Sequence, residues 1–287
     1  MRIRKAGVAG MFYPRDRATC LDQIAACTRP LHGQTLPSPL YGGVVPHAGW
    51  TYSGATAGQV YAALAAEARP DAIVLFGAVH SWAVRAASAY GEGAWQTPLG
   101  ELVVDHELGQ ATVDVSDGLV VIDPGAHDGE HSIEVQLPFL RHLFGVVPIL
   151  PIAVPPFEGA HQVGIAVARA AGELDRSILA VGSSDLTHYG PRYGHAPVGT
   201  GEQALRWTHD NDARILDLLV EMRADAMVGE AAVQRNACGG GALAATVACV
   251  AALGATRGIT LHYTTSHEVL PMGRPSDMVG YGAVVFA

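Results

Sequence analysis

The chain has 287 residues, of which 49% are hydrophobic and 34 are glycine, and its formal net charge is −9. This length and composition allow one sizeable core and exclude an intrinsically disordered chain, which has low hydrophobicity and high charge. The negative charge, with no basic run beyond Arg2–Lys5, argues against a protein that binds nucleic acid or an anionic membrane.

The chain carries no clear signal for export or membrane insertion. Two glycines and Pro14 interrupt the apolar N-terminal stretch, so we interpret it as part of the mature protein. The uncharged span from Ala237 to Thr256 is mostly alanine and glycine, which predicts a buried helix rather than a membrane span. The cysteines form no C-x-x-C pair, which predicts free thiols and a cytoplasmic location. They are Cys20, Cys27, Cys238 and Cys249.

Strand-like and helix-like stretches alternate along the chain. In chain order we predict a strand at Gly43–Val45, a helix at Ala55–Ala68, a strand at Ala72–Phe76, a helix near Asp105–Val113, a strand at Leu119–Ile122, a helix at His131–Phe144, a strand at Val146–Val154, a helix at Gly159–Ala171, a strand at Ser177–Gly182, a helix at Glu202–Met222, a helix after Cys238, and closing strands at Ile259–Ser266 and Gly280–Ala287. The strands are β-branched and uncharged, which indicates a buried, mixed but largely parallel sheet covered on both faces. We therefore expect one three-layer α/β/α domain over residues 1–287.

Three histidines, His47, His80 and His188, each stand shortly after the end of a predicted strand. In open α/β sheets, ligands bind beyond the carboxyl ends of the strands, so we expect these imidazoles to meet at one edge. A single histidine of this kind is more often a polar loop residue or a hydrogen-bonded core residue. Three strand ends with the same feature favour a shared site.

Cys238 completes the group. It precedes three glycines and the predicted alanine-rich helix, where the helix dipole and free N–H groups favour a thiolate. Two imidazoles and one thiolate suit a divalent transition metal and leave positions open for reaction. The predicted ligands are therefore His47, His80 and Cys238. His188, with Asp185 to orient its ring, is the predicted acid–base pair.

The segment HDGEHSIE, residues 127–134, is a weaker signal for a metal site. His127 and His131 stand four residues apart, but Gly129 interrupts the helical spacing that a shared ion requires. We interpret the segment as a capped helix start with acidic residues near its positive end. His131 and Glu134 are then expected to contact the metal ligands rather than the metal itself.

Several motifs occur in a fixed order along the chain: AGMFYP, VPHAGWTYSG, FGAVHSW, DGEHSIEVQLPFL, VGSSDLTHYG and NACGGG. Together they resemble the Memo family, called AmmeMemoRadiSam system protein B in bacteria and archaea. The resemblance runs from about residue 6 to the C-terminus. It implies a fold like that of the class III extradiol dioxygenases, in which non-haem iron cleaves catechol rings.

The resemblance also implies roles for individual residues. In Memo-like proteins two histidines and a cysteine hold the metal, which fall here on His47, His80 and Cys238. The histidine and aspartate of the family's SSD..H motif fall on His188 and Asp185. The cysteine replaces the carboxylate of an extradiol iron site, which is a departure from the dioxygenase pattern.

These observations predict a metal-dependent redox enzyme, with Fe(II) as the expected metal and Cu or Zn as alternatives. The expected substrate is a small, aromatic or phenolic molecule that chelates the metal, with O2 as co-substrate. Trp50, Tyr52, Trp82 and Tyr189 flank the site residues and would wall an aromatic-friendly pocket. We expect no nucleic-acid or membrane partner.

Two other classes of function stay open. One is a non-catalytic protein that binds metal or a peptide and acts as an adaptor. The other is a hydrolase in which Cys238 is the nucleophile and His188 with Asp185 the base. Metal content separates the hydrolase from the redox enzyme, and turnover of a substrate separates the adaptor from both.

Overall fold

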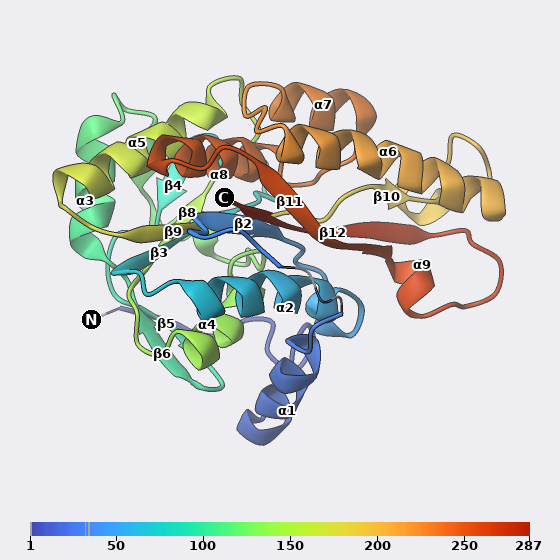
Figure 1. The fold of residues 1–287 in the computed structure, drawn as a ribbon, viewed down its shortest axis with the longest axis horizontal. Helices are drawn as coiled ribbons and strands as arrows, with labels where there is room; N and C mark the ends of the chain where they lie inside the picture. The colour runs from blue at the N-terminus through green and yellow to red at the C-terminus, as the bar shows by residue number, and fades with distance from the viewer. Residues whose placement is uncertain (1, 32, 34) are drawn as a thin grey trace.

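The centre of the fold is a mixed β-sheet, seen in a computed structural model that describes residues 2–31, 33 and 35–287. Across the sheet, the strands are β10 (His188–Tyr189), β12 (Met278–Phe286), β2 (Gly42–Val45), β9 (Ile178–Ser183), β3 (Ala72–Gly77), β8 (Ile149–Ala153), β4 (Ala87–Ala89) and β7 (Val120–Ile122), and β11 (Gly258–Thr265) also pairs with β12 (Figure 1). A separate small sheet has the order β1 (Ile3–Arg4), β5 (Ala94–Thr97) and β6 (Gly100–Val103).

Helices cover both faces of the large sheet (Figure 1). One face carries α3 (His106–Val115), α5 (Ala160–Glu173), α6 (Glu202–Val220), α7 (Met227–Gln234) and α8 (Gly240–Leu253). The other carries α1 (Arg17–Cys27), α2 (Trp50–Glu67) and α4 (Leu137–Leu143), and the short α9 (Ser266–Val269) joins β11 to β12. The predicted α/β fold with three layers is therefore confirmed.

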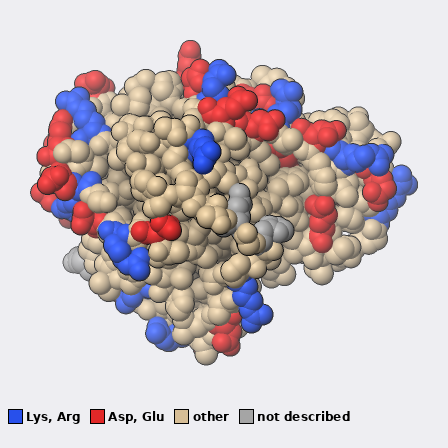
Figure 2. Space-filling view, viewed as in Figure 1, with Lys and Arg blue, Asp and Glu red and all other residues tan. Residues whose placement is uncertain are grey.

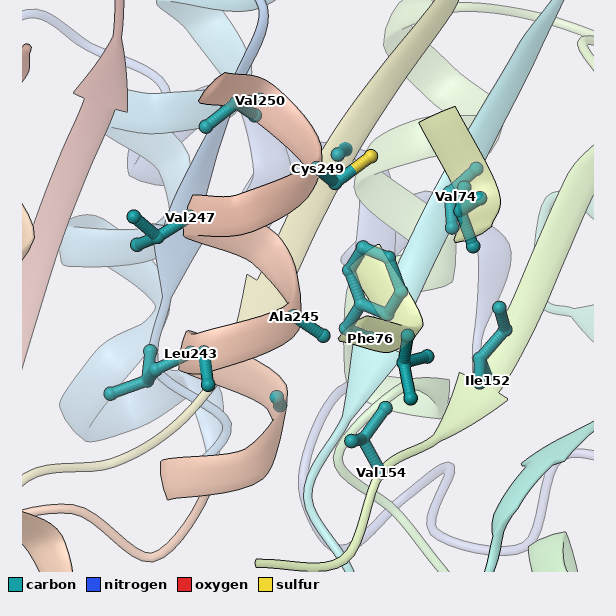
Figure 3. Close-up of a cluster of buried hydrophobic side chains, with 14 of the residues drawn as sticks. Val74, Phe76, Ile152, Val154, Leu243, Ala245, Val247, Cys249 and Val250 are labelled. Atoms are coloured by element: carbon teal, nitrogen blue, oxygen red, sulfur yellow. The ribbon is translucent and has the colours of Figure 1, made fainter. Parts of the chain in front are cut away.

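The side chains of β3 show how the sheet divides the core. Ile73 and Leu75 pack on the α2 and α4 side, whereas Val74 and Phe76 pack against α5 and α8. Figure 3 shows Phe76 facing the α8 helix. This alternation follows from the two-residue repeat of a strand, and both sets are buried because helices cover both faces. Full burial of each such side chain stabilises the fold by about 1.5–3 kcal/mol.

The middle strands of the sheet run parallel. β2 pairs with β9, β9 with β3 and β3 with β8 in parallel register, so that Val45 lies opposite Ser183 and Phe76 opposite Gly182. Antiparallel pairs flank them: β12 pairs in this way with β2, β10 and β11, and β4 pairs in this way with β8. The carboxyl ends of β2, β9 and β3 therefore meet at one edge, as predicted.

One predicted helix is wrong in its first half. The expected helix at His131–Phe144 begins only at Leu137, after a 3-10 turn over Glu134–Gln136. The Glu130 carboxylate accepts the N–H groups of residues 131 and 132, so these residues form a loop rather than a helix. Pro138 lies in the first turn of α4, where a missing N–H costs nothing, and starts the helix instead of interrupting it.

The surface in Figure 2 shows Lys and Arg interspersed with Asp and Glu around its margins, with no single basic patch on that face. The predicted helix after Cys238 is α8, and its residues from Gly240 to Val250 are buried. Among the described helices, none combines the length and the apolar character that crossing a bilayer requires. All four cysteines are free, as predicted.

The contact between α5 and α8 generates a prediction about stability. A Cβ added at Gly164 would collide with the Ala245 carbonyl oxygen, whereas at Gly172, in the same helix, it would meet open space. Gly164→Ala should lower the free energy of unfolding by about 1–3 kcal/mol, because the helices must separate. Gly172→Ala should leave it unchanged or raise it by up to about 1 kcal/mol. Urea unfolding of both variants checks this, and equal effects would contradict the close approach.

Candidate functional site

Three neighbouring strands deliver polar residues to the edge where β2, β9 and β3 end. His47 follows β2, His80 follows β3, and Asp185 and His188 follow β9. Since β9 lies between β2 and β3, these segments are adjacent in space although they are far apart in the sequence. This is the meeting point that the strand pattern predicted.

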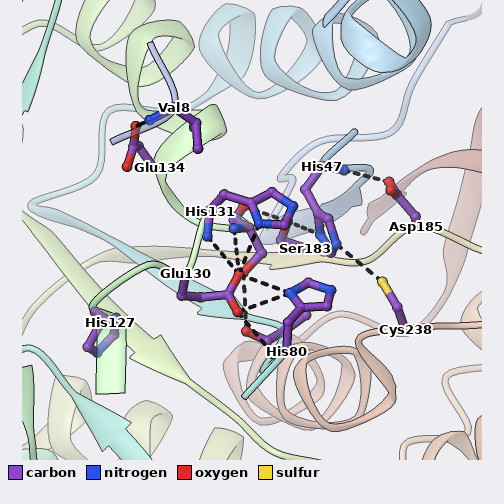
Figure 4. Close-up of polar contacts among 12 residues, drawn as sticks. Val8, His47, His80, His127, Glu130, His131, Glu134, Ser183, Asp185 and Cys238 are labelled. Carbon is purple, nitrogen blue, oxygen red and sulfur yellow. Dashed lines mark hydrogen bonds and ion pairs between the residues drawn. The ribbon is translucent and has the colours of Figure 1, made fainter. Parts of the chain in front are cut away.

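His47, His80 and His131 form a cluster in which one ring nitrogen of each lies within 4.8 Å of the others. The ring of His131 stacks on that of His80, with centroids 5.1 Å apart, and meets the ring of His47 edge-on at 5.4 Å. Figure 4 shows the three rings turned toward one another. Three imidazoles this close are a group that can hold a metal ion.

Cys238 lies beside this cluster. Its Sγ is 3.2 Å from Nε2 of His47 and 3.8 Å from the Ser184 hydroxyl. Cys238 stands just before α8, whose N-cap is Gly239, and its N–H donates to the Asp185 carbonyl at 3.1 Å. This backbone hydrogen bond joins the segment after β9 to the segment before α8, next to the thiol.

A buried hydrogen-bond chain fixes which nitrogen of His47 faces the thiol. The Ser183 hydroxyl donates to the Ser132 carbonyl at 2.8 Å, so its single proton is used. Nδ1 of His47, 3.0 Å from Ser183 Oγ, must therefore be the donor. The lone pair of the neutral ring is then on Nε2, the atom that faces Cys238 and is available to a metal.

Glu130 fixes the proton of His80 on Nδ1, as Ser183 does for His47. Its carboxylate lies 3.0–3.1 Å from Nδ1 of His80 and accepts the His80 backbone N–H at 3.0 Å. Because a carboxylate only accepts, Nδ1 carries the proton and Nε2 is left free. Glu130 was interpreted as part of a helix cap, so this role was not predicted; the available signal was a carboxylate standing between two histidines, His127 and His131.

Asp185 supports His47 rather than His188. Its Oδ1 accepts the N–H groups of His47 at 2.7 Å and Ala48 at 3.2 Å. Nδ1 of His188 instead lies 3.1 Å from the Leu186 carbonyl, and the contacts of the described residues include no hydrogen bond from Asp185 to that ring. The predicted orienting hydrogen bond is therefore wrong. The backbone carbonyl orients His188, and its Nε2 is left to accept a proton.

The four central groups shift one another's pKa. Burial would raise the pKa of Cys238, but the charge of His47 and hydrogen bonds from His47 and His80 lower it to about 6. Burial lowers the pKa of His47, yet Cys238 and Asp185 raise it to about 9, and Cys238 and Glu130 raise that of His80 to about 10. Burial and the charge of His47 lower the pKa of His131 to about 4. At neutral pH the metal-free site thus pairs a thiolate with protonated imidazoles, in which Nδ1 keeps its hydrogen bond and Nε2 carries the second proton that a metal would displace.

The cluster opens into a pocket of about 600 Å³. His188 lies on its wall, and the aromatic lining consists of Phe12, Tyr52, Tyr193 and Tyr281. Of the four aromatic residues expected there, only Tyr52 lines it. Trp50 and Tyr189 are buried in the core, and Trp82 is 96% exposed.

Comparison with known proteins identifies the family. The model of the Memo-like proteins matches residues 4–285. A MEMO1 family protein of Thermococcus onnurineus is 34% identical over 99% of both chains. One of Methanopyrus kandleri is 36% identical over 99% of this chain and 98% of its own, and one of Methanothermobacter thermautotrophicus is 35% identical over 97% and 98%.

The chain belongs to the Memo family. The family resemblance of its motifs is confirmed. In this Memo-family chain Cys238 contacts His47, whose ring lies 5.3 Å from that of His80. Their role as ligands stays a prediction. His131, which was expected only to support the site, is a member of the cluster itself.

The charge state of the Cys238 thiol in this Memo-family protein can be measured. In the metal-free protein, iodoacetamide should label Cys238 at a rate that rises as the pH increases through about 6 and then levels off. The reason is that only the thiolate reacts, and it forms only above the pKa of the thiol. Cys249 is the internal control, because burial raises its pKa to about 12 and it should stay unlabelled in the folded protein. Peptide mass spectrometry gives both rates. A midpoint for Cys238 near the ordinary value of about 8.5 would contradict the ion pair.

Proposed function

We propose that this protein is a metal-dependent redox enzyme that binds Fe(II), or alternatively Cu, through His47, His80 and Cys238. Zn would bind the same ligands but, having no redox chemistry, would serve only as a Lewis acid. The observation that carries the proposal is the arrangement of donors around the thiol. Ser183 and Glu130 each hold the Nδ1 of a histidine, so that in both rings Nε2 is the nitrogen on which a metal would replace a proton. This is the arrangement of supporting carboxylates and hydroxyls that metal-binding histidines use in proteins.

The distance between Cys238 and His47 fits two ligands of one ion. Metal–nitrogen bonds of about 2.0–2.1 Å and metal–sulfur bonds of about 2.3 Å place the ligands of one ion roughly 3–4 Å apart. The Cys238 Sγ to His47 Nε2 distance of 3.2 Å lies in this range. A redox-active ion held here would supply electron transfer to O2 and act as a Lewis acid for a chelating substrate. Soft thiolate and imidazole donors suit Fe, Cu and Zn better than Mg or Ca.

His188 is the proposed acid–base residue. Its Nδ1–H donates to the Leu186 carbonyl, so the basic Nε2 is the nitrogen left for a substrate proton in the pocket. The Tyr193 ring meets it edge-on at 5.1 Å and restricts its rotation. In this proposal Asp185 acts on His47, by holding its backbone and by its negative charge. The phenolic and aromatic lining favours a small aromatic substrate.

A cysteine hydrolase is the second candidate, because a thiolate beside an imidazole is a competent nucleophile. The predicted partner was His188, but the ring that contacts Cys238 is that of His47. The first N–H of the following turn is also occupied, since Gly239 donates to Ser184 Oγ at 2.9 Å. That N–H is therefore not free to stabilise a developing oxyanion, which favours the metal-dependent enzyme.

Metal content tests the proposed ligands. The wild-type protein, purified without oxygen, should hold about one redox-active metal per chain, and His47→Ala and His80→Ala should lose it because each removes one of three ligands. His161→Ala is the matched control, since that ring on α5 contacts only Gln162 in the described structure. Elemental analysis and electron paramagnetic resonance give the result. Full metal retention in His47→Ala and His80→Ala would contradict the assignment of these histidines as metal ligands.

Substitution of His188 separates chemistry from metal binding. His188→Gln should keep its metal and its fold, yet lose turnover by about 10²–10⁴-fold, because proton transfer typically contributes that much. His161→Gln, on α5 and outside the lining of this pocket, is the control and should retain turnover. Before a substrate is known, the pH dependence of catechol binding to the metal-loaded protein serves as the measurement. Loss of metal in His188→Gln would make His188 a ligand instead.

A further inference from the structure

The basic run at the N-terminus contains one buried member, Arg4. Its side chain is 10% exposed and forms an ion pair with Glu134, which is 1% exposed, at 2.6 Å. The guanidinium also lies over the Trp95 ring, 4.1 Å from its centroid. A buried arginine held on two sides is ordered, so its remaining donors point in fixed directions.

Those donors hold the Glu130 loop, defined as residues 127–134. Nε and Nη2 of Arg4 donate to the His127 carbonyl at 3.2 and 3.0 Å, and Nη2 donates to the Glu130 carbonyl at 2.6 Å. Together with the ion pair to Glu134, Arg4 binds the start, the middle and the end of this loop. Figure 4 shows Glu130 and His131 of this loop next to His47 and His80, and Glu134 farther away, beside Val8.

Other residues of the N-terminal segment also contact the Glu130 loop. The second carboxylate oxygen of Glu134 accepts the Val8 N–H at 2.8 Å and the Tyr13 hydroxyl at 3.0 Å. Phe12 packs its ring on His131, with centroids 4.7 Å apart, and its carbonyl accepts the Trp50 N–H at 2.7 Å. Residues 4–13 therefore link the Glu130 loop to the turn that follows His47.

We propose that Arg4 is a positioning residue for the metal site, acting through Glu130. Arg4 fixes the backbone of the Glu130 loop, and the Glu130 carboxylate in turn binds Nδ1 and the N–H of His80 and the N–H of His131. The orientation of His80 thus depends on a residue at the other end of the chain. This inference rests on the proposed metal function for its consequence, but the hydrogen bonds through which it acts are present without metal.

Arginine is specifically suited to this position. Its planar fork reaches two carbonyls and a carboxylate at once, whereas a lysine offers three donors on one nitrogen and cannot span them. Arg4→Lys should therefore keep the charge opposite Glu134 but not the hold on the loop. The zinc affinity of Arg4→Lys should therefore fall as that of Arg4→Gln does, but by a smaller factor.

Zinc affinity of the metal-free protein tests the proposal. Arg4→Gln should bind Zn²⁺ about 10–100-fold more weakly than wild type, the usual effect of losing a residue behind a ligand. Arg2→Gln is the matched control, because Arg2 lies over the Tyr90 ring, 5.8 Å from its centroid, and the described contacts give it no hydrogen bond to the loop. Glu130→Gln should weaken binding similarly, and the double variant little further, because both act on His80 along one path.

Amide hydrogen exchange provides a readout that does not depend on metal. In metal-free Arg4→Gln, the N–H groups of His80, His131 and residue 132 should exchange faster than in wild type, while those in α5 keep their rates. Arg4→Lys gives the same readout if Arg4→Gln does not fold. Unchanged zinc affinity with unchanged exchange at these amides, or fully additive losses in the double variant, would overturn the proposal. Failure of the wild type to bind zinc would instead overturn the proposed function, and exchange alone would then decide the role of Arg4.

Discussion

The parallel pairing of β2, β9 and β3 is the constraint on which the site depends. Because the three strands share a direction and a register, their carboxyl ends stop at one level, and the residues after them are held within reach of one another. β12 and β2 continue the sheet in antiparallel pairing, so this edge has a defined position in a rigid layer. A site built from the ends of buried strands is held more accurately than one built on loops alone.

Polar side chains next to the cluster fix the orientation of its imidazole rings. Gln136 donates to Ser183 and the Pro46 carbonyl, and Tyr61 donates to Gln136, all in the buried core. Buried polar groups are costly unless they are paired, and here the pairs lead through Ser183 to Nδ1 of His47. The metal-free cluster holds protons on His47 and His80, and a metal ion would displace them. Binding should therefore weaken as the pH falls, since acid restores those protons.

The parts of this arrangement that follow from local pattern were predictable. His47 and His80 follow short β-branched runs, and those runs are buried strands because helices cover both faces. Cys238 precedes a glycine-rich helix start, and that helix is α8. The short strands β4, β5 and β6 were missed, because their sequences ASA, AWQT and GELV contain no run of β-branched residues, unlike the equally short β2 and β7.

The contacts that depend on distant parts of the chain were not predictable. His131 joins the cluster because Glu130 and Arg4 hold an irregular loop, and Arg4 reaches the Glu130 carbonyl across 126 positions of sequence. Nothing local to either residue indicates that contact. The Asp185 carboxylate was assigned to His188 by proximity in sequence, whereas the turn of the backbone directs it to His47. In each case the fold, rather than spacing, decides the partner.

X-ray absorption spectroscopy of the zinc-loaded protein tests the central claim most directly, because it reports the atoms bound to the metal. The account predicts one sulfur at about 2.3 Å together with imidazole nitrogens at about 2.0–2.1 Å, and loss of the sulfur in Cys238→Ser. A wild-type spectrum with no sulfur neighbour, or with oxygen neighbours alone, would contradict it.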